Sequence, residues 1–303
     1  MSTEEVYIRS FVTAGALASA VAFLVIAIGL LGRKRLGKTG LGMVGGVSLA
    51  LAWVTAHIVM RGPPLGDLAH SMEAWRTLVW PPDVTRRFPA LVAIGCSAGV
   101  IAHLLPRKGI ARWVVAWIAM SMILWSLTEA MRRNGANPVS MGAFSLAFAL
   151  IQIAIWARIE KAAERDSGML LACGLMVIVI GTGIIQLVIR NYALGLVVLA
   201  GVVPIAILGV CSRTHLGVML GSVVPATVTT MLAIAFLSGF LSGEPVAAFG
   251  MAPVLVGPVV LEPRFLPDLS RRRAWWNGWL ARYGLLVGLV VAGVAIAVGW
   301  VGP

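Results

Sequence analysis

The chain has 303 residues, of which 59% are hydrophobic and only 12% charged, and its mean hydropathy is +0.94. Soluble domains carry about a quarter charged residues, so this composition predicts an integral membrane protein. Ten membrane helices of roughly 20 residues would occupy about 200 residues, which leaves only connections and excludes a folded ectodomain or a cytosolic catalytic domain.

Ten apolar runs follow one another along the chain and predict an all-α polytopic helix bundle that forms a single transmembrane domain over residues 1–303. The runs are 11–31, 39–60, 88–105, 113–130, 138–157, 169–189, 192–211, 216–242, 246–261 and 283–300. The run 246–261 is short and the Arg190-Asn191 connection is tight, so nine spans are the alternative.

Basic residues indicate the orientation of these runs in the membrane. The connections after the odd-numbered runs hold 16 of the 24 lysine and arginine residues, and the N-terminal tail and the other connections hold 8. Because cytoplasmic loops carry the excess of Lys and Arg, we expect both termini outside, in the cell inner membrane. The formal net charge of +12 is then explained by orientation and by anionic lipids at the cytoplasmic face, so no nucleic-acid partner is expected.

Two connections carry amphipathic segments. Residues 68–80 place Leu68, Met72, Trp75 and Val79 at helical spacing and predict an outer interfacial helix. Residues 264–282 combine arginines with several tryptophans and predict an inner segment that contacts anionic lipids.

Glu129 is the exceptional charge within a predicted span. One stripe of the run 113–130 contains Ser121, Trp125, Thr128 and Glu129, and Arg132 and Arg133 follow one turn later. Such a stripe normally faces the bundle interior or a wet cavity. Glu129 is therefore either part of a structural ion pair that caps the helix or a gating or substrate-contacting carboxylate.

Prolines mark the runs 216–242 and 246–261. The first contains Pro225 followed by Thr227 and Thr230, and the second contains Pro253 and Gly257. A proline frees a helix carbonyl, and transporters hold substrates at such interruptions. These residues are candidate substrate contacts, unless the nearby threonines bond the freed carbonyls within a simple kink.

Weak metal ligands lie near the predicted outer face. His70 and Glu73 are three residues apart, and His57 lies near the outer end of the second run. They fit either a metal site of an outer-face enzyme or a solvated polar surface. No cofactor is expected, and an enzyme is the less favoured class.

Small residues predict close contacts between helices. Gly42 and Gly46, Gly95 and Gly99, and Gly217 and Gly221 each have the G-x-x-x-G spacing of helix packing. The three cysteines lie within or at the end of apolar runs, so we interpret them as packing residues rather than as a disulfide framework.

The length and span number resemble those of drug/metabolite transporters and auxin-efflux-like carriers. The first family keeps its termini in the cytoplasm, and the second breaks helices four and nine, whereas run 113–130 here has neither proline nor glycine. We therefore assign no family. The sequence favours a permease for a small solute or a lipid-soluble compound. The alternatives are a non-catalytic membrane subunit of a larger complex and an outer-face metal-dependent enzyme.

Overall fold

The computed structural model describes residues 3–61, 72–73, 87–106, 109–165, 168–212, 220, 223–241, 249–260 and 272–301. Within these ranges the chain is helical and contains no β-strand. The helices are α1 (Thr3–Leu31), α2 (Arg33–Arg61), α5 (Phe88–Leu104), α6 (Ile110–Leu127), α7 (Glu129–Arg133), α8 (Pro138–Arg165), α9 (Gly168–Val188), α10 (Tyr192–Leu199), α11 (Val202–Cys211), α12 (Val223–Leu241), α14 (Met251–Val260) and α15 (Arg272–Val301).

Seven helical segments are long and apolar enough to cross a membrane, and these belong to α1, α2, α6, α8, α9, α10 with α11, and α15. Two shorter apolar helices are Phe88–Leu104 and Val223–Gly239. The described α14 has 10 residues and is about 15 Å long, roughly half the thickness of the hydrocarbon core. The fold is that of a multi-pass helical membrane protein.

The described part of each predicted run falls on one helix or on two consecutive ones, with two internal breaks that the apolar pattern does not predict. In run 113–130 the continuous helix α6 ends at Leu127, and Thr128 separates it from α7. Run 192–211 is divided into α10 and α11 by a turn at Ala200 and Gly201. Trp53 of α2 lies against Gly201, where any larger side chain would collide with its indole ring.

The tight connection between α9 and α10 is confirmed. Arg190 has a φ of 62°, a left-handed conformation that reverses the chain within a few residues. The Asn191 side chain donates a hydrogen bond to the Gln186 side chain at 3.0 Å, and Gln186 donates one to the carbonyl of Ala235 in α12 at 2.8 Å. The hairpin is therefore anchored to the centre of the bundle.

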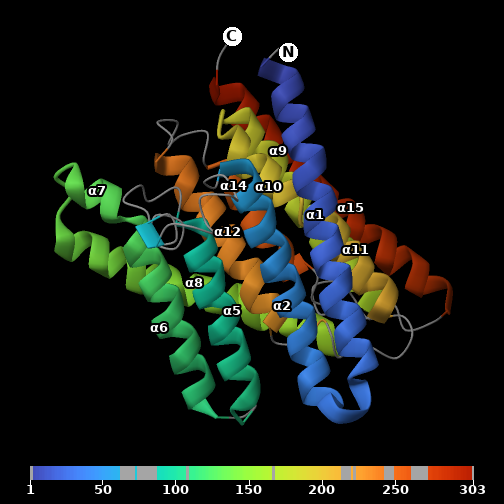
Figure 1. Ribbon diagram of the computed structural model, residues 1–303. Coiled ribbons are helices and arrows are strands. Elements are labelled where there is room, and N and C mark those ends of the chain that lie inside the picture. The colour runs from blue at the N-terminus through green and yellow to red at the C-terminus, as the bar shows by residue number, and fades with distance from the viewer. Residues whose placement is uncertain are drawn as a thin grey trace.

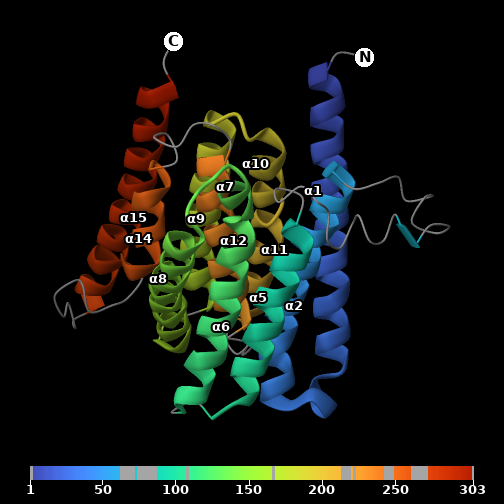
Figure 2. The same cartoon turned by 90° about the vertical axis from the view of Figure 1, so that its left-hand side faces the viewer.

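The helix α12 is the centre of the bundle. Every side chain described in it, from Val223 to Gly239, is buried, and α12 packs against α2, α5, α6, α8 and α9. A helix that is apolar on all sides must be surrounded by other helices. Figures 1 and 2 show this arrangement and place the start of α1 and the end of α15 at the same end of the bundle.

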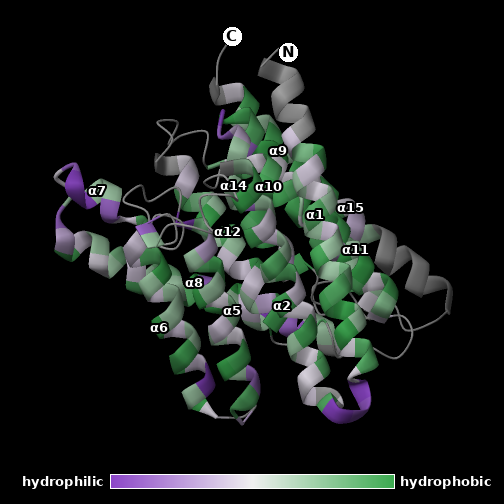
Figure 3. Cartoon of the chain, in the orientation of Figure 1, coloured by the Kyte–Doolittle hydropathy of each residue, from purple (hydrophilic) through white to green (hydrophobic). Residues whose placement is uncertain are grey.

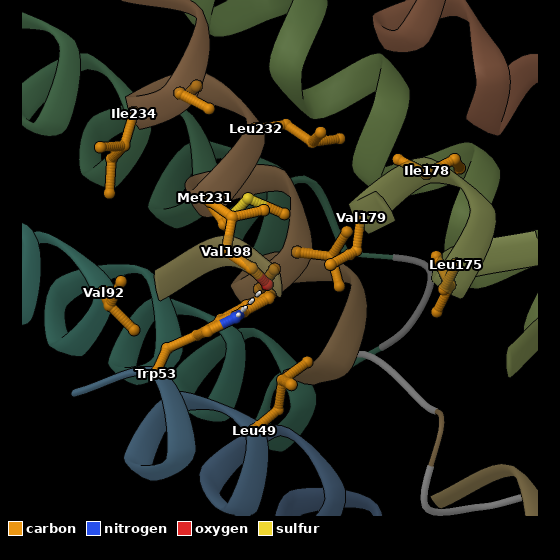
Figure 4. Close-up of a cluster of buried hydrophobic side chains, with 14 of the residues drawn as sticks. Leu49, Trp53, Val92, Leu175, Ile178, Val179, Val198, Met231, Leu232 and Ile234 are labelled. Atoms are coloured by element: carbon orange, nitrogen blue, oxygen red, sulfur yellow. Dashed lines mark hydrogen bonds between the residues drawn. The ribbon is translucent and has the colours of Figure 1, made fainter. Parts of the chain in front are cut away.

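The hydrophobic core joins the two halves of the chain around α12. In Figure 4, Trp53 lies among residues that include Val92, Val179 and Met231, and its indole N–H donates a hydrogen bond to the carbonyl of Val198 at 3.3 Å. The hydrophilic residues gather instead at helix ends, notably at the turn between α1 and α2 and around α7 (Figure 3).

The predicted glycine contacts are confirmed at Gly46, Gly95 and Gly99. A side chain at Gly95 would collide with Thr230, and one at Gly99 would collide with Ala226, both in α12. Gly46 of α2 lies similarly against Val223. Three helices therefore approach closely because of their small residues. Gly217 and Gly221 lie outside the described residues.

The two amphipathic segments are only partly described. Within 68–80, only Met72 and Glu73 are described, and both side chains are exposed. Within 264–282, residues 272–282 form the start of α15, so this part is helical and continuous with the last span.

Candidate functional site

The helices α6, α8 and α12 pack against one another and form a three-helix junction. Two aromatic contacts fix how they face each other. The rings of Phe148 in α8 and Phe236 in α12 stack with centroids 5.1 Å apart, and Trp113 in α6 meets Trp156 in α8 edge to face at 6.4 Å.

Four polar side chains of this junction have no hydrogen-bond partner among the described residues. They are Ser121 of α6, Gln152 and Trp156 of α8 and Thr229 of α12, and we call them the polar seam. Gln152, Trp156 and Thr229 are completely buried, and both the oxygen and the nitrogen of the Gln152 amide are unpartnered within the described structure.

The seam residues of α8 and α12 lie on the helix faces that carry the stacked Phe148–Phe236 pair. Gln152 and Trp156 lie one and two turns beyond Phe148, and Thr229 lies two turns before Phe236 on the same face. Because α8 and α12 run in opposite directions (Figure 2), these positions all lie on one side of the stacked Phe148–Phe236 pair. At a rise of 1.5 Å per residue they are about 6, 12 and 10 Å from it along the helices.

Leaving such groups unpartnered is energetically costly. Burying an amide or a hydroxyl without a hydrogen bond costs about 1–3 kcal/mol by mutational data, and more in a fully apolar medium. Buried polar groups in proteins are normally satisfied by protein, water or ligand. The seam therefore offers donors and acceptors to a small polar molecule.

A buried ion pair lies at the N-terminal end of α6. Arg112 pairs with Glu160 of α8, and both side chains are at least 90% buried. The guanidinium also lies 4.8 Å from the centre of the Trp113 ring, and its Nε has no partner among the described residues. Because both charges are buried, each depends on the other for compensation.

A second ion pair lies at the C-terminal end of α6. Glu129 pairs with the buried Arg87, which precedes α5, and with the exposed Arg133 in α7. Arg87 also donates a hydrogen bond to the hydroxyl of Ser126 at 3.3 Å. The hydrogen bond from Arg87, assisted by Arg133, lowers the pKa of Glu129 and keeps it ionised.

Arg132 and Arg133 are the two expected partners of Glu129 one turn later in the chain. The structure pairs Glu129 with Arg133. Arg132 instead lies over the ring of Trp125 at 3.6 Å and donates to its backbone carbonyl. Thr128 also donates to that carbonyl, at 3.0 Å, so its hydroxyl is bonded locally. Of the expected stripe, only Ser121 belongs to the polar seam.

Pro225 does not interrupt the described part of α12. It is the third residue of that helix, in the first turn, where its missing N–H leaves no carbonyl of the described helix without a partner. The hydroxyls of Thr227 and Thr230 donate to the carbonyls four residues earlier, at 2.8 and 2.9 Å. Both hydroxyls therefore bond carbonyls of their own helix, and the described residues 223–241 contain no break, whereas residues 221 and 222, before Pro225, lie outside the described residues.

The described parts of the two proline-containing runs have different main neighbours. Whereas α12 packs against α2, α5, α6, α8 and α9, α14 packs mainly against α15, α9 and α8. Pro253 lies in the first turn of α14, and Gly257 lies against Leu286 of α15 and Ile178 of α9. Pro258 is the proline inside this helix. Gly257 thus serves a helix contact.

The proposed metal ligands are described only in part. The ring of His57 is buried and stacks on Phe88 with centroids 5.3 Å apart, whereas Glu73 is exposed. His70 lies outside the described residues. Among the residues that the structure describes, no group of three metal-ligating side chains occurs.

Sequence reasoning missed most of the junction. Gln152 was available as an amide within an otherwise apolar run, which is a signal for an intramembrane polar site. Arg112 and Glu160 lie outside the predicted runs 113–130 and 138–157, although α6 and α8 extend to include them. Comparison of the chain with protein-family models, with curated proteins and with solved structures finds no match.

Proposed function

We propose that this protein is a permease for a small solute and that the solute passes along the polar seam between α6, α8 and α12. The observation that carries the proposal is the completely buried Gln152 amide, which has no partner among the described residues for either of its polar atoms. Buried polar groups in proteins are normally satisfied by protein, water or ligand, so an amide without a partner among the described residues is a candidate binding group.

Two features of the junction support a passage over a purely structural role. A subunit that only fills space in a larger complex gains nothing from unpartnered polar atoms, since apolar residues of the same size would pack better. Moreover, an ion pair lies near each end of α6: Arg112 of α6 pairs with Glu160, and Glu129, the first residue of α7, pairs with Arg87. Pairs at both ends suit a path that is closed on both sides in this conformation and opens when one pair separates.

The orientation and the number of crossings belong to the same proposal. We propose ten crossings with both termini outside in the cell inner membrane, and basic connections that contact anionic lipids at the cytoplasmic face. The distribution of Lys and Arg supports this orientation. The start of α1 and the end of α15 lie at the same end of the bundle in Figures 1 and 2, as an even number of crossings requires. A reporter active only in the cytoplasm should be active when fused after Lys38 or Arg165 and inactive after Arg133. The reverse pattern would contradict this orientation.

A cysteine accessibility experiment tests the path. In a variant without Cys96, Cys173 and Cys211, Thr229→Cys should react with a small aqueous thiol reagent. Leu232→Cys is the matched control, since Leu232 is as deeply buried in α12 and is apolar. Reaction of Thr229→Cys alone supports a wet path. If both positions stay unreactive in every condition, the result contradicts the permease proposal. Co-purification of other membrane proteins would then support a subunit of a larger assembly.

A further inference from the structure

We infer that the polar seam binds small uncharged amides and ureas, and that these are the solutes the protein moves. The inference rests on the proposed function and adds the chemical class of the substrate. It follows from the hydrogen-bonding groups, the charges and the aromatic neighbours of the seam.

The seam offers donors and acceptors together. The Gln152 side chain provides a carbonyl acceptor and an NH₂ donor on one planar group, Trp156 provides an N–H donor, and the hydroxyl of Thr229 provides either. A second amide complements the Gln152 amide directly, because its N–H can bond the Gln152 oxygen while its carbonyl accepts from the Gln152 nitrogen. Amides and ureas can therefore satisfy both atoms at once.

The distribution of charge favours an uncharged solute. The seam residues carry no formal charge, so an ion there would lose its hydration without a counter-charge. At the C-terminal end of α6, Glu129 is accompanied by Arg87, Arg132 and Arg133. The described side chains at this end are thus positive overall and repel cations.

At the other end of α6, basic side chains also outnumber acidic ones among the described residues. Glu160 lies in α8 together with Arg158 and Lys161, and it pairs with Arg112 of α6. The carboxylate is again outnumbered by basic side chains among the described residues. Both approaches to the seam are therefore unfavourable for cations, and the seam itself provides no charge for an anion.

Aromatic rings flank the amide of Gln152. Phe148 and Trp156 lie one turn to either side of it on the same face of α8, and Phe148 is stacked on Phe236. The Phe148 ring is also stacked on Phe144, with centroids 5.5 Å apart, so other rings occupy its faces. Bulky rings on either side of Gln152 therefore favour a small solute, and urea and acetamide are small.

Flux measurements with the purified full-length protein in liposomes test the inference. The probes are urea and acetamide as flat neutral amides, glycerol as a neutral polyol, and acetate and methylammonium as ions, each followed by light scattering after an osmotic step. We expect protein-dependent flux of urea and acetamide, with little for glycerol and none for the ions. One lost hydrogen bond weakens binding by up to about tenfold. Thr229→Val removes one bond and should reduce amide flux by up to about tenfold, whereas Gln152→Met removes two and should reduce it by up to about a hundredfold.

Thr182→Val is the matched control. Thr182 is also completely buried, but its hydroxyl donates to the carbonyl of Ile178 in its own helix at 2.8 Å, away from the seam. This variant should keep the amide flux. Amide flux that survives Gln152→Met and Thr229→Val in folded protein would overturn the seam as the binding site.

The substrate class and the proposed function fail in different ways. Flux of glycerol or of an ion that exceeds amide flux would overturn the amide class while the permease proposal stands. Absence of protein-dependent flux for every probe, in protein that elutes as a folded species, would overturn the class and count against the permease as well.

Discussion

Replacement of Gln152 by methionine should make the protein more stable. Met has nearly the same length and a similar helix propensity, and its thioether needs no hydrogen bond. The substitution therefore removes the two unpartnered polar atoms of Gln152 without emptying the space that the side chain fills. This is unusual, because most substitutions of a completely buried residue are destabilising.

The expected gain follows from the cost of burying an unsatisfied polar group. Mutational data give about 1–3 kcal/mol for such a group, so the free energy of unfolding of Gln152→Met should rise by about 1–3 kcal/mol. Thermal or denaturant unfolding of both proteins in the same detergent measures the change.

Gln186 provides a matched control in the same chain. It is completely buried, as is Gln152, but its amide donates to the carbonyl of Ala235 and accepts from the side chain of Asn191. Gln186→Met leaves these groups without their partner and should lower the free energy of unfolding by about 1–3 kcal/mol. The two substitutions should therefore have opposite signs.

Equal losses of stability in both variants would refute the reasoning. Such a result would mean that the Gln152 amide is satisfied within the protein, and the seam would then have no group waiting for a solute. A gain in Gln152→Met together with a loss of amide flux is the combination expected of a binding residue.

Three further predictions concern the ion pairs and the central helix. Glu160→Gln should lower the free energy of unfolding by about 3–5 kcal/mol because Arg112 is left buried without a counter-charge, and Arg112→Met in addition should restore most of it; no recovery in the double variant would contradict a paired role. The hydrogen bond from Arg87 lowers the pKa of Glu129 in the folded protein. The ionised Glu129 should therefore contribute fully to stability above the unfolded-state pKa of about 4.3, and this contribution should be lost as the pH falls toward the lower folded-state pKa. Unfolding measured against pH should show this loss in the parent protein and not in Glu129→Gln. Gly95→Ala should cost about 1–3 kcal/mol, since the added methyl group collides with α12; unchanged thermal stability would contradict so close a contact.

The sequence determined the features that depend on local pattern. Long apolar runs must form helices in a bilayer because backbone groups have no water to bond there, so the all-helical fold and the helix positions follow from composition and run length. The spacing of Gly95 and Gly99 predicts a close helix contact because two small residues four positions apart lie on one face of a helix. The pairing of Glu129 with Arg133 also follows from sequence, since residues four apart lie on one face of a helix.

Other features depend on which helices become neighbours. Arg87 and Glu129 are 42 residues apart, and Arg112 and Glu160 are 48 apart, so no local rule connects them. The roles of Thr227 and Thr230 also required the structure, because a threonine in a helix can bond either its own backbone or a neighbour.

The two buried glutamines illustrate this division most directly. Both lie in apolar runs, and the sequence around each gives no reason to treat them differently. Packing places Gln186 beside the Ala235 carbonyl and the Asn191 amide, whereas Gln152 lies at the junction of α6, α8 and α12 with no partner among the described residues. A side chain's hydrogen bonds are decided by its neighbours in space, so only the tertiary structure separates the structural glutamine from the candidate binding residue.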